Sequence, residues 1–587
     1  MKSSQRVIPW IVFVLAMIYA SQKVFMPERI DGPYDLNTFR EIAVSAKGRT
    51  KPIDTVARNG LMNISGRQSI QGEYGEEDLT AIEWYIELAT VPTQGLDRKV
   101  FRIDHPDVLT LAGLDGEDRT RFSYNEIKDA EQEINRQAEL ASNTKAKARD
   151  PFQRAVLVLA QRLSLYRELS SLGSPYYLPP NEVESEWRSF IEVINMNPQD
   201  QDAQRVLQLL KSYRDAQRME EAVASGEATQ EDLDEAIGYF NSMVAAQHEV
   251  IKARLPGEVI KSKLEVIKNQ ARPFVSASAL YVMAFLAGCF GLMTTQLKKD
   301  TLSKTLLGTM TSLVVAAFIV QTIGIIARIY LQGRPPVTNL YSSAIFVGWF
   351  CAIIGLYIDR HMKLGLGGIM ASVIGFGTLI VAHNLGSSGD TMEMMQAVLD
   401  SNFWLATHVV VITIGYSATF FAGFLSIAYL LLGIFTSALD RERGKSLVKM
   451  IYGVICFATV LSFVGTVLGG IWADQSWGRF WGWDAKENGA ALIVFMNLLI
   501  LHARWGGMIR DRGIVNLAIA GNIITAWSWF GTNMLGVGLH SYGFTQSAMF
   551  WLIMFVLSQL SLISLGLLPM KYWRSKFERP EVAAESE

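Results

Sequence analysis

The sequence predicts an all-α polytopic membrane protein, with about ten transmembrane helices and a large, mainly helical extracytoplasmic insertion after the first helix. Hydrophobic residues make up 50% of the 587-residue chain and charged residues only 19%. The two kinds are segregated, because residues 27–272 are polar and rich in charge, whereas residues 273–570 are almost continuously apolar. A run of about twenty apolar residues is enough to cross a bilayer as a helix. The second region therefore predicts a multi-span membrane domain.

The chain begins with a candidate membrane anchor, residues 1–26. Lys2 and Arg6 precede an apolar run, Val7–Met26, which is long enough to span a bilayer. The segment Ile18-Tyr19-Ala20 is a poor match to the small-x-small pattern of a signal-peptide cleavage site. We therefore expect a retained anchor with its N-terminus in the cytoplasm, rather than a cleaved signal peptide.

Residues 27–272 form the predicted extracytoplasmic domain. Arg49 to Asn59 reads as an exposed turn that enters a helix. From about Tyr124 onward, apolar residues recur at three- and four-residue spacing, which predicts a mainly helical domain with few strands. The charge-rich segment 126–150 has two interpretations, a solvated helix face or a docking surface for a partner.

Residues 273–570 divide by hydropathy into further spans, which together with the anchor make about ten. Basic residues gather in alternate loops, and the positive-inside rule places such loops in the cytoplasm. The prediction is a multi-pass protein of the bacterial cytoplasmic membrane, with residues 27–272 outside and the tail 571–587 inside. The predicted spans lie near 274–296, 306–331, 338–358, 364–382, 404–435, 450–472, 488–505, 514–537 and 547–569.

Composition argues against several other classes of protein. The formal net charge of −2 supplies no basic excess to neutralise phosphates, so we expect no nucleic-acid partner. Three cysteines, Cys289, Cys351 and Cys456, lie far apart inside apolar runs. This spacing predicts neither a zinc site nor a CxxC redox centre nor a disulfide framework.

The loop 472–488 between two spans lies outside in this topology and is the segment most suggestive of a function. Its sequence, WADQSWGRFWGWDAKEN, interleaves four tryptophans with charges of both signs. An aromatic belt at the lipid headgroups accounts for one or two of these rings. Aromatic faces beside fixed charges are also what a flat, carboxylate-bearing ligand such as haem needs. Both interpretations, a platform for a planar ligand and a belt with packing, stay open on these residues alone.

The seven histidines differ in predicted depth. His408, at the outer end of a span, and His540, in an outer turn, share the membrane face of the tryptophan loop. Neutral imidazoles from two sides are a common axial arrangement for haem iron, although a lone interfacial histidine is usually structural. His502 lies roughly 20 Å deeper at 1.5 Å per residue, so it cannot share a porphyrin with His408. An ionisable side chain inside a span is a functional candidate by default. Isolated surface positions are expected for His105, His248 and His361, and the outer end of span 364–382 for His383.

The segment Trp477–Asn488, WGRFWGWDAKEN, resembles the tryptophan-rich WWD signature of the haem-handling cytochrome c assembly family. The flanking segments Leu501–Arg504, Gly538–Tyr542 and Phe403–His408 match the family too. Together they resemble the CcsA (ResC) type of cytochrome c synthase subunit over residues 320–570. In one departure, Ser342 stands where the family's Asn-x-Tyr-Glu segment has Glu, so the expected carboxylate is missing there.

The resemblance implies a role in cytochrome c biogenesis, in which haem b is transported and presented outside for thioether attachment to the CxxCH segment of apocytochromes c. It implies a cytochrome c haem lyase subunit that is active only with a CcsB/ResB-like membrane subunit. That subunit would supply the second ligand of an inner haem site at His502. A thiol-reducing membrane protein is a further implied partner. His408 and His540 are the implied catalytic residues, and the implied haem-binding residues are His408, His540, His502, Trp477, Trp481, Trp483, Asp484, Arg479 and Glu487, with the three histidines as axial ligands and Arg479 as a candidate partner for a propionate.

Two other classes of function remain open. A haem exporter or chaperone without synthase activity would share the tryptophan loop. A structural membrane protein would carry tryptophans that are merely interfacial, and it would purify colourless from haem-replete cells.

Overall fold

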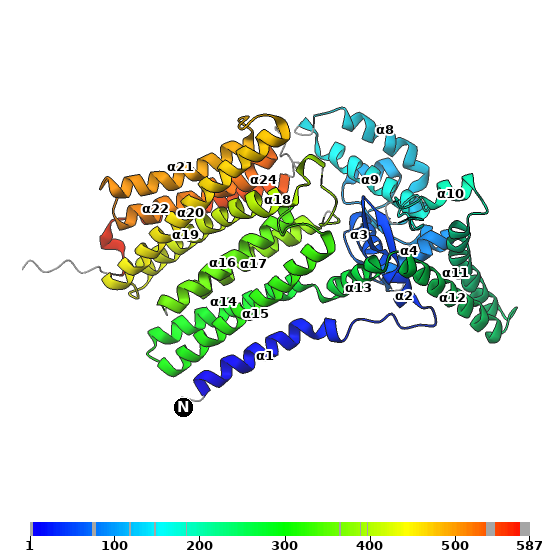
Figure 1. The fold of residues 1–587 in the computed structure, drawn as a ribbon, viewed down its shortest axis with the longest axis horizontal. Helices are drawn as coiled ribbons and strands as arrows, with labels where there is room; N and C mark the ends of the chain where they lie inside the picture. Colours follow the sequence, from blue (N-terminus) through cyan, green and yellow to red (C-terminus); the bar gives the residue numbers. More distant parts are fainter. Residues whose placement is uncertain are drawn as a thin grey trace, which may run out of the picture.

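The computed structural model describes residues 4–535 and 546–575, except for the short segments 73–77, 117–118, 146–147, 183–184, 363–364, 388 and 396. It shows a bundle of long, roughly parallel helices with a second body at one end (Figure 1). Ten of the described helices are long and apolar enough to cross a membrane. The prediction of an all-α polytopic membrane protein is therefore confirmed.

The membrane helices begin and end close to the predicted spans, although several are longer. The longest extend beyond the apolar run because polar residues add further turns at one end, as in α15 and α20. The bundle consists of α1 (Ser4–Phe25), α14 (Pro273–Gln296), α15 (Asp300–Gln332), α16 (Leu340–Met362), α17 (Leu366–Gly386), α18 (Asn402–Trp404) with α19 (Val410–Phe435), α20 (Arg441–Trp477), α21 (Ala485–Trp505), α22 (Asp511–Ala526) with α23 (Thr532–Met534), and α24 (Gln546–Gly566).

The second body, here called the extramembrane domain, has a hydrophobic core of its own. Its largest fully buried side chains include Trp84, Tyr85, Phe101 and Phe122. The described strands form three two-stranded antiparallel ladders, β1 (Ala43–Ala46) with β2 (Arg49–Pro52), β3 (Ser69–Ile70) with β4 (Leu79–Thr80), and β5 (Phe101–Arg102) with β6 (Arg121–Phe122). The helices are α2 (Leu36–Glu41), α3 (Ile53–Ser65), α4 (Ala81–Thr90), α5 (Pro92–Asp97), α6 (Pro106–Ala112), α7 (Tyr124–Ile127), α8 (Glu131–Ser142), α9 (Pro151–Ser170), α10 (Phe190–Met196), α11 (Gln201–Ser225), α12 (Gln230–Arg254) and α13 (Pro256–Ala271).

One local prediction about this domain is wrong. The segment from Arg49 to Asn59 is not an exposed turn, because it forms strand β2 and the first turns of α3 and is largely buried. Lys51 and Asp54 are only 3% and 2% exposed. Their charges suggested solvent, but Lys51 pairs with Asp390 at 2.7 Å and Asp54 with Arg58 at 2.9 Å, which compensates for their burial.

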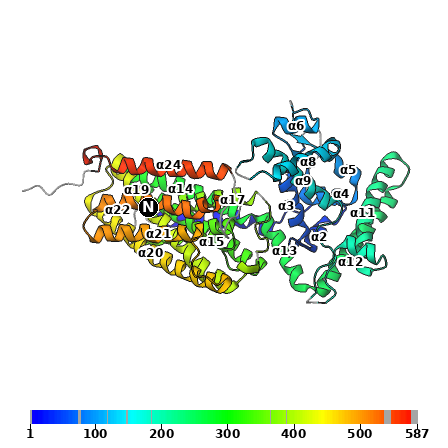
Figure 2. The ribbon, with the colours of Figure 1, turned by 90° about the horizontal axis from the view of Figure 1, so that it is seen from above.

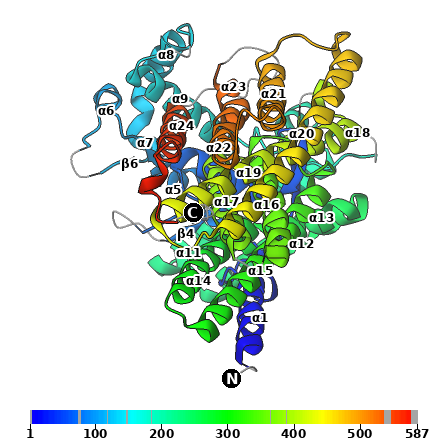
Figure 3. The same cartoon turned by 90° about the vertical axis from the view of Figure 1, so that its left-hand side faces the viewer.

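The two bodies are joined by a direct helix-to-helix connection. Helix α13 of the domain ends at Ala271, Arg272 adopts a positive φ of 43°, and Pro273 begins α14. Helix α1 runs alongside α15 at the edge of the bundle (Figures 1 and 3). Gly308 of α15 permits this approach, because a Cβ there would lie 2.9 Å from Pro9 of α1. The domain covers one end of the bundle (Figure 2), which we call the domain end.

Candidate functional site

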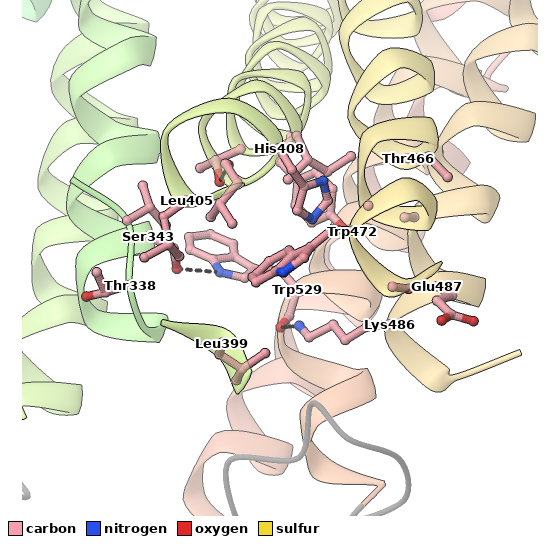
Figure 4. Close-up of a pocket in the computed structure, with 18 of the residues that line it drawn as sticks. Thr338, Ser343, Leu399, Leu405, His408, Thr466, Trp472, Lys486, Glu487 and Trp529 are labelled. Carbon is pink, nitrogen blue, oxygen red and sulfur yellow. Dashed lines mark hydrogen bonds between the residues drawn. The ribbon is translucent and has the colours of Figure 1, made fainter. Parts of the chain in front are cut away.

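An open cavity of about 240 Å³ lies at the domain end of the bundle (Figure 4). Its walls come from α16, α19, α20 and α21, the loop before α18, and the irregular turns beside α18 and α22. The lining includes the predicted site residues His408, Trp477, Trp481 and Glu487. It also includes Asn339, Ser343, Met395, Leu399, Tyr416, Gly469, Trp472, Lys486 and Trp529.

His408 lies in a π-helical turn, Leu405–Val409, between α18 and α19. Its Nδ1 is 2.7 Å from the carbonyl oxygen of Gly465 on α20. A carbonyl oxygen can only accept a hydrogen bond, so Nδ1 carries a proton, and in the neutral ring the lone pair is on Nε2. A turn of this kind is frequent at functional sites because it redirects side chains without breaking the helix. The bond to Gly465 thus fixes both the tautomer and the direction of the ring.

The ring of His408 fits against α20 only because Gly469 has no side chain. A Cβ at Gly469 would lie 2.6 Å from Cε1 of His408. The neighbouring glycine, Gly470, likewise admits the ring of Phe480, because its Cβ would lie 2.6 Å from that ring. Glycines spaced along one face let side chains and backbones approach closely in membrane helices. The cavity therefore depends on small residues of α20 as much as on aromatic ones.

Indole rings form the apolar walls around the histidine. Trp472 of α20 meets His408 edge-on, with ring centroids 5.7 Å apart at 61°. Trp404 lies nearly parallel to Trp472, with centroids 6.4 Å apart, and its Nε1 donates to Gln475 at 3.1 Å. Across the cavity, Nε1 of Trp529 donates to Ser343 at 2.9 Å. These hydrogen bonds fix the orientations of the two indoles, of which Trp529 lines the cavity and Trp404 supports Trp472 from behind.

Lys486 places a positive charge in this apolar surrounding. Its Nζ donates to the carbonyl oxygens of Ser528 and Trp529, at 3.1 and 2.7 Å. Both carbonyls belong to the π-helical turn Trp527–Gly531. A lysine in the first turn of a helix is disfavoured by the helix dipole. Its hydrogen-bond partners in the described part of the chain are neutral, so its ammonium form would be suited to an anionic group in the cavity.

The acidic residues of the tryptophan loop hold the backbone of the loop in place. The loop is shorter than predicted, because α20 extends to Trp477 and α21 begins at Ala485. Asp484 caps α21 and forms a capping box with Glu487. Glu487 accepts from the backbone N–H groups of Gly482 and Asp484, at 2.8 and 3.0 Å. Both carboxylates therefore have structural duties.

The remaining predicted loop residues lie outside the cavity lining. Arg479 packs over Gly482 and lies 3.9 Å from Glu487. Trp483 adopts a positive φ of 56° and is 76% exposed, with its ring edge-on to Trp481 at 6.1 Å. The structure thus brings together His408, Trp477, Trp481 and Glu487, and leaves Arg479, Trp483 and the buried Asp484 beside the cavity.

Of the other two predicted histidine ligands, the structure describes only one. His540 lies outside the described residues. His502 lies near the opposite end of α21 from the cavity and is exposed on the bundle surface. Its Nδ1 donates to the carbonyl of Leu498 at 2.9 Å, and its ring is 5.8 Å from Trp505. His408 and His502 cannot contact one ligand in this arrangement.

Ser342 takes over a structural role at the start of α16. Its Oγ accepts from the backbone N–H groups of Thr338 and Asn339, at 2.9 and 3.0 Å, while Asn339 accepts from the N–H of Ser342 at 2.9 Å. This reciprocal arrangement is a capping box, in which a glutamate at the third position commonly serves. Serine therefore supplies the acceptor that the expected carboxylate would have provided.

Most of the cavity lining was missed by the choice of site residues from the sequence, and four of the missed residues matter most to the argument. They are Gly469, Trp472, Lys486 and Trp529. The first turn of a span is an unusual place for a lysine, so Lys486 could have been noticed. Nothing in the sequence pattern reveals the π-helical turns that aim His408 and Trp529 into the cavity.

Comparison with known proteins agrees with this picture. The family model described as "Cytochrome C assembly protein" matches residues 337–540. NrfI of Wolinella succinogenes is 26% identical over 553 residues, which cover 88% of this chain and 56% of NrfI. The cytochrome c biogenesis protein CcsA of Prochlorococcus marinus strain MIT 9303 is 28% identical over 267 residues, covering 40% of this chain and 83% of that protein. CcsA of Synechococcus sp. strain CC9902 is 28% identical over 265 residues, covering 40% and 87%.

These matches extend over different parts of the chain. The chain spans little more than half of NrfI. The similarity to NrfI covers more of this chain than the helices from α14 onward can supply, so it reaches into the extramembrane domain. The matched region 337–540 contains every described cavity residue. Residues 337–540 thus match the cytochrome c assembly family, and the membrane bundle is similar to proteins of the CcsA type.

Proposed function

We propose that this protein acts in cytochrome c assembly and presents haem, as its substrate, in the cavity at the domain end for attachment to apocytochromes c. The observation that carries the proposal is His408, whose Nε2 lone pair is fixed by the bond from Nδ1 to Gly465 in an aromatic cavity. Neutral imidazole of this tautomer is a usual axial ligand of haem iron. His540 is proposed as the ligand from the other side.

The other cavity residues have distinct tasks in this proposal. Trp472, Trp477 and Trp481 provide apolar contact for the macrocycle. Lys486 binds a propionate, because a buried ammonium gains most from a charge-assisted hydrogen bond. Arg479 and Trp483 contact parts of haem that project beyond the cavity, while Asp484 and Glu487 keep the loop in its shape.

The chemistry of attachment requires mainly positioning. Each thioether forms when a cysteine S–H adds across a vinyl C=C, with sulfur bonding one carbon and the proton ending on the other, so no electrons are gained or lost. The protein contributes by holding the vinyl groups near the CxxCH thiols and by axial ligation. The thiols must arrive reduced, which is the proposed task of a thiol-reducing membrane protein.

We further propose that His502 belongs to a second site that a CcsB/ResB-like subunit completes. His502, Phe495 and Leu499 lie on one exposed face of α21, at helical spacing, and Phe495 and Leu499 are 65% and 51% exposed. A single imidazole fills one axial position of an iron atom. Because His502 lies on an outer helix face, the opposite position would be filled by a ligand from another molecule. In this arrangement the extramembrane domain and the cavity are extracytoplasmic, and His502 is near the cytoplasm.

Mutation of the proposed ligands tests the first site. We expect His408→Ala and His540→Ala each to weaken haem retention in the purified protein and to stop cytochrome c maturation in cells. Added imidazole should restore part of both, because it fills the vacated coordination position. Unchanged spectra and unchanged maturation in both variants would refute the assignment. Haem retention with no attachment, when an apocytochrome and the partner are co-expressed, would identify an exporter or chaperone instead.

The second site is tested by the partner. We expect the chain alone to lack a stable six-coordinate haem at His502, and co-expression with a CcsB-like subunit to produce one that His502→Ala removes. The measurement is haem content and visible spectrum with and without the partner. A full six-coordinate signal from the chain alone, lost in His502→Ala, would show that the second ligand lies within this sequence.

A further inference from the structure

Between α17 and α18, the described residues 389–395 and 397–401 form part of the cavity wall and touch the extramembrane domain. We call this segment the wall loop. Two of its residues, Met395 and Leu399, line the cavity. Met394, next to Met395, packs on Gly48 of the domain so closely that a Cβ on Gly48 would lie 2.4 Å from its sulfur. One short segment therefore belongs to both bodies.

On the domain side, the wall loop is held by the hairpin of β1 and β2. Lys47 and Gly48 form its two-residue turn, and both have positive φ, as a type I′ turn requires. Alternation along β2 places Arg49 and Lys51 on one face. Both reach Asp390 of the wall loop, at 3.1 and 2.7 Å.

This contact is buried and built from charged groups. Arg49, Lys51 and Asp390 have side chains that are 11%, 3% and 5% exposed. Arg49 also makes two hydrogen bonds to Glu265 of α13, at 2.8 and 2.7 Å. Removing one partner from such a group leaves an uncompensated buried charge, which is far more costly than losing a surface pair. Burial raises the pKa of Asp390, but the charges of Arg49 and Lys51 outweigh it and hold that pKa well below its usual range.

On the bundle side, the next residue of the wall loop is held just as firmly. Thr391 accepts from Arg328 of α15 through its hydroxyl and its carbonyl oxygen, both at 2.8 Å. The same carbonyl accepts from the side chain of Asn339 at 2.9 Å. Asn339 lines the cavity and caps α16, and Arg334 binds Asp400 at the other end of the loop. The loop is therefore clamped between the two bodies at adjacent residues.

We propose that the extramembrane domain is a positioning element of the cavity, and that Asp390 is the positioning residue through which the β1–β2 hairpin holds Met395 and Leu399 in the wall. The effect of this contact on haem rests on the proposed function. The coupling between the domain and the cavity wall does not depend on it. If the domain were merely tethered by α13, the wall loop would keep its place without Asp390.

The first experiment measures the position of the wall without haem. Leu399→Cys is made in a background in which Cys289, Cys351 and Cys456 are replaced by alanine, and its reaction with an impermeant maleimide is timed in the full chain. We expect Asp390→Asn to raise the labelling rate roughly tenfold or more, because removing one member of a buried ion pair is strongly destabilising. An unchanged rate would overturn the proposal.

The matched control is a second ion pair between the same hairpin and the wall loop. Lys47 and Glu393 form an exposed pair, with side chains 58% and 46% exposed, so Lys47→Gln should leave the labelling rate unchanged. A cysteine at Ser212, which is only 3% exposed in the distant α11, should stay unlabelled in all variants, which shows that the domain remains folded. A general increase at both sites would mean unfolding and would overturn the positioning role.

The second experiment uses the spectrum of bound haem. We expect Asp390→Asn to change the axial-ligand spectrum of the purified protein, and Asp390→Glu to restore most of it, since the carboxylate is what the hairpin holds. The results distinguish failure of the proposed haem function from failure of the proposed positioning role of Asp390. If His408→Ala has no effect while Asp390→Asn still speeds labelling at position 399, the coupling stands without the haem role. If His408→Ala abolishes the spectrum while Asp390→Asn changes neither labelling nor spectrum, the coupling is wrong.

Discussion

Gly469→Ala provides the most direct test of how the cavity holds its histidine. The new Cβ would lie 2.6 Å from Cε1 of His408. Carbon atoms prefer separations of about 3.5–4.0 Å, so the ring must recede by about 1 Å. The bond from Nδ1 to Gly465 cannot survive such a shift unchanged, and losing it costs about 1 kcal/mol. A displacement of this size at a reacting centre reduces activity by about 10²-fold.

The helix itself should not suffer from the substitution, because alanine favours a helix over glycine by roughly 1 kcal/mol. Gly453→Ala on the same helix is the matched control, since a Cβ there meets nothing within 4 Å. The assays are the visible spectrum of retained haem and the yield of mature cytochrome c. We expect Gly469→Ala to lose both and Gly453→Ala to keep both. A wild-type spectrum in Gly469→Ala would refute the assignment of His408 as a ligand held by its contact with α20.

Three further predictions follow from the site and from its surroundings. Lys486→Met should weaken haem binding by about tenfold or more, since a hydrogen bond to a charged group contributes about 1.5–3 kcal/mol, and Lys486→Arg should restore part of it in a haem titration. Cysteines at Ser225 and Ser446 should react and fail to react, respectively, with an impermeant thiol reagent in intact cells, and the reverse pattern would overturn the topology. The depressed pKa of Asp390 means that its carboxylate stabilises the folded state above the unfolded-state pKa of about 3.9, and that this contribution is lost only as the pH falls toward the lower folded value. The haem spectrum should therefore be constant between about pH 5 and 8, and a transition in that interval that Asp390→Asn abolishes would contradict the clamp.

The sequence predicted the architecture because apolar runs and basic loops are local, additive signals. Ten spans and a helical insertion could be read from hydropathy alone, and the described helices agree. The position of Trp477 on a helix could not, because the ends of α20 and α21 depend on Gly478 and on the capping box of Asp484. Helix ends are decided by a few hydrogen bonds, which are weak beside the hydrophobic pattern.

Side-chain partners were the least predictable part of the site. Lys51 and Asp390 are 339 positions apart in the chain, and no periodicity connects a strand of one body to a loop of the other. Glu487 reads as a ligand-binding carboxylate in a loop but serves the loop's own backbone. The same residue types perform both tasks, so only tertiary contacts separate them.

The packing of the bundle constrains how the two histidines can be connected. Helices α19 and α20 approach so closely that a Cβ on Gly415 would lie 2.6 Å from Ser462, and one on Gly465 would lie 2.8 Å from Ile412. Helix α22 meets α19 with Asn522 against Gly423, where a Cβ would lie 2.1 Å from the amide oxygen. Contacts of this kind leave no space for a macrocycle between these described helices. In the proposed function, a haem that moves between His502 and His408 therefore does not pass between α19 and α20 or between α19 and α22.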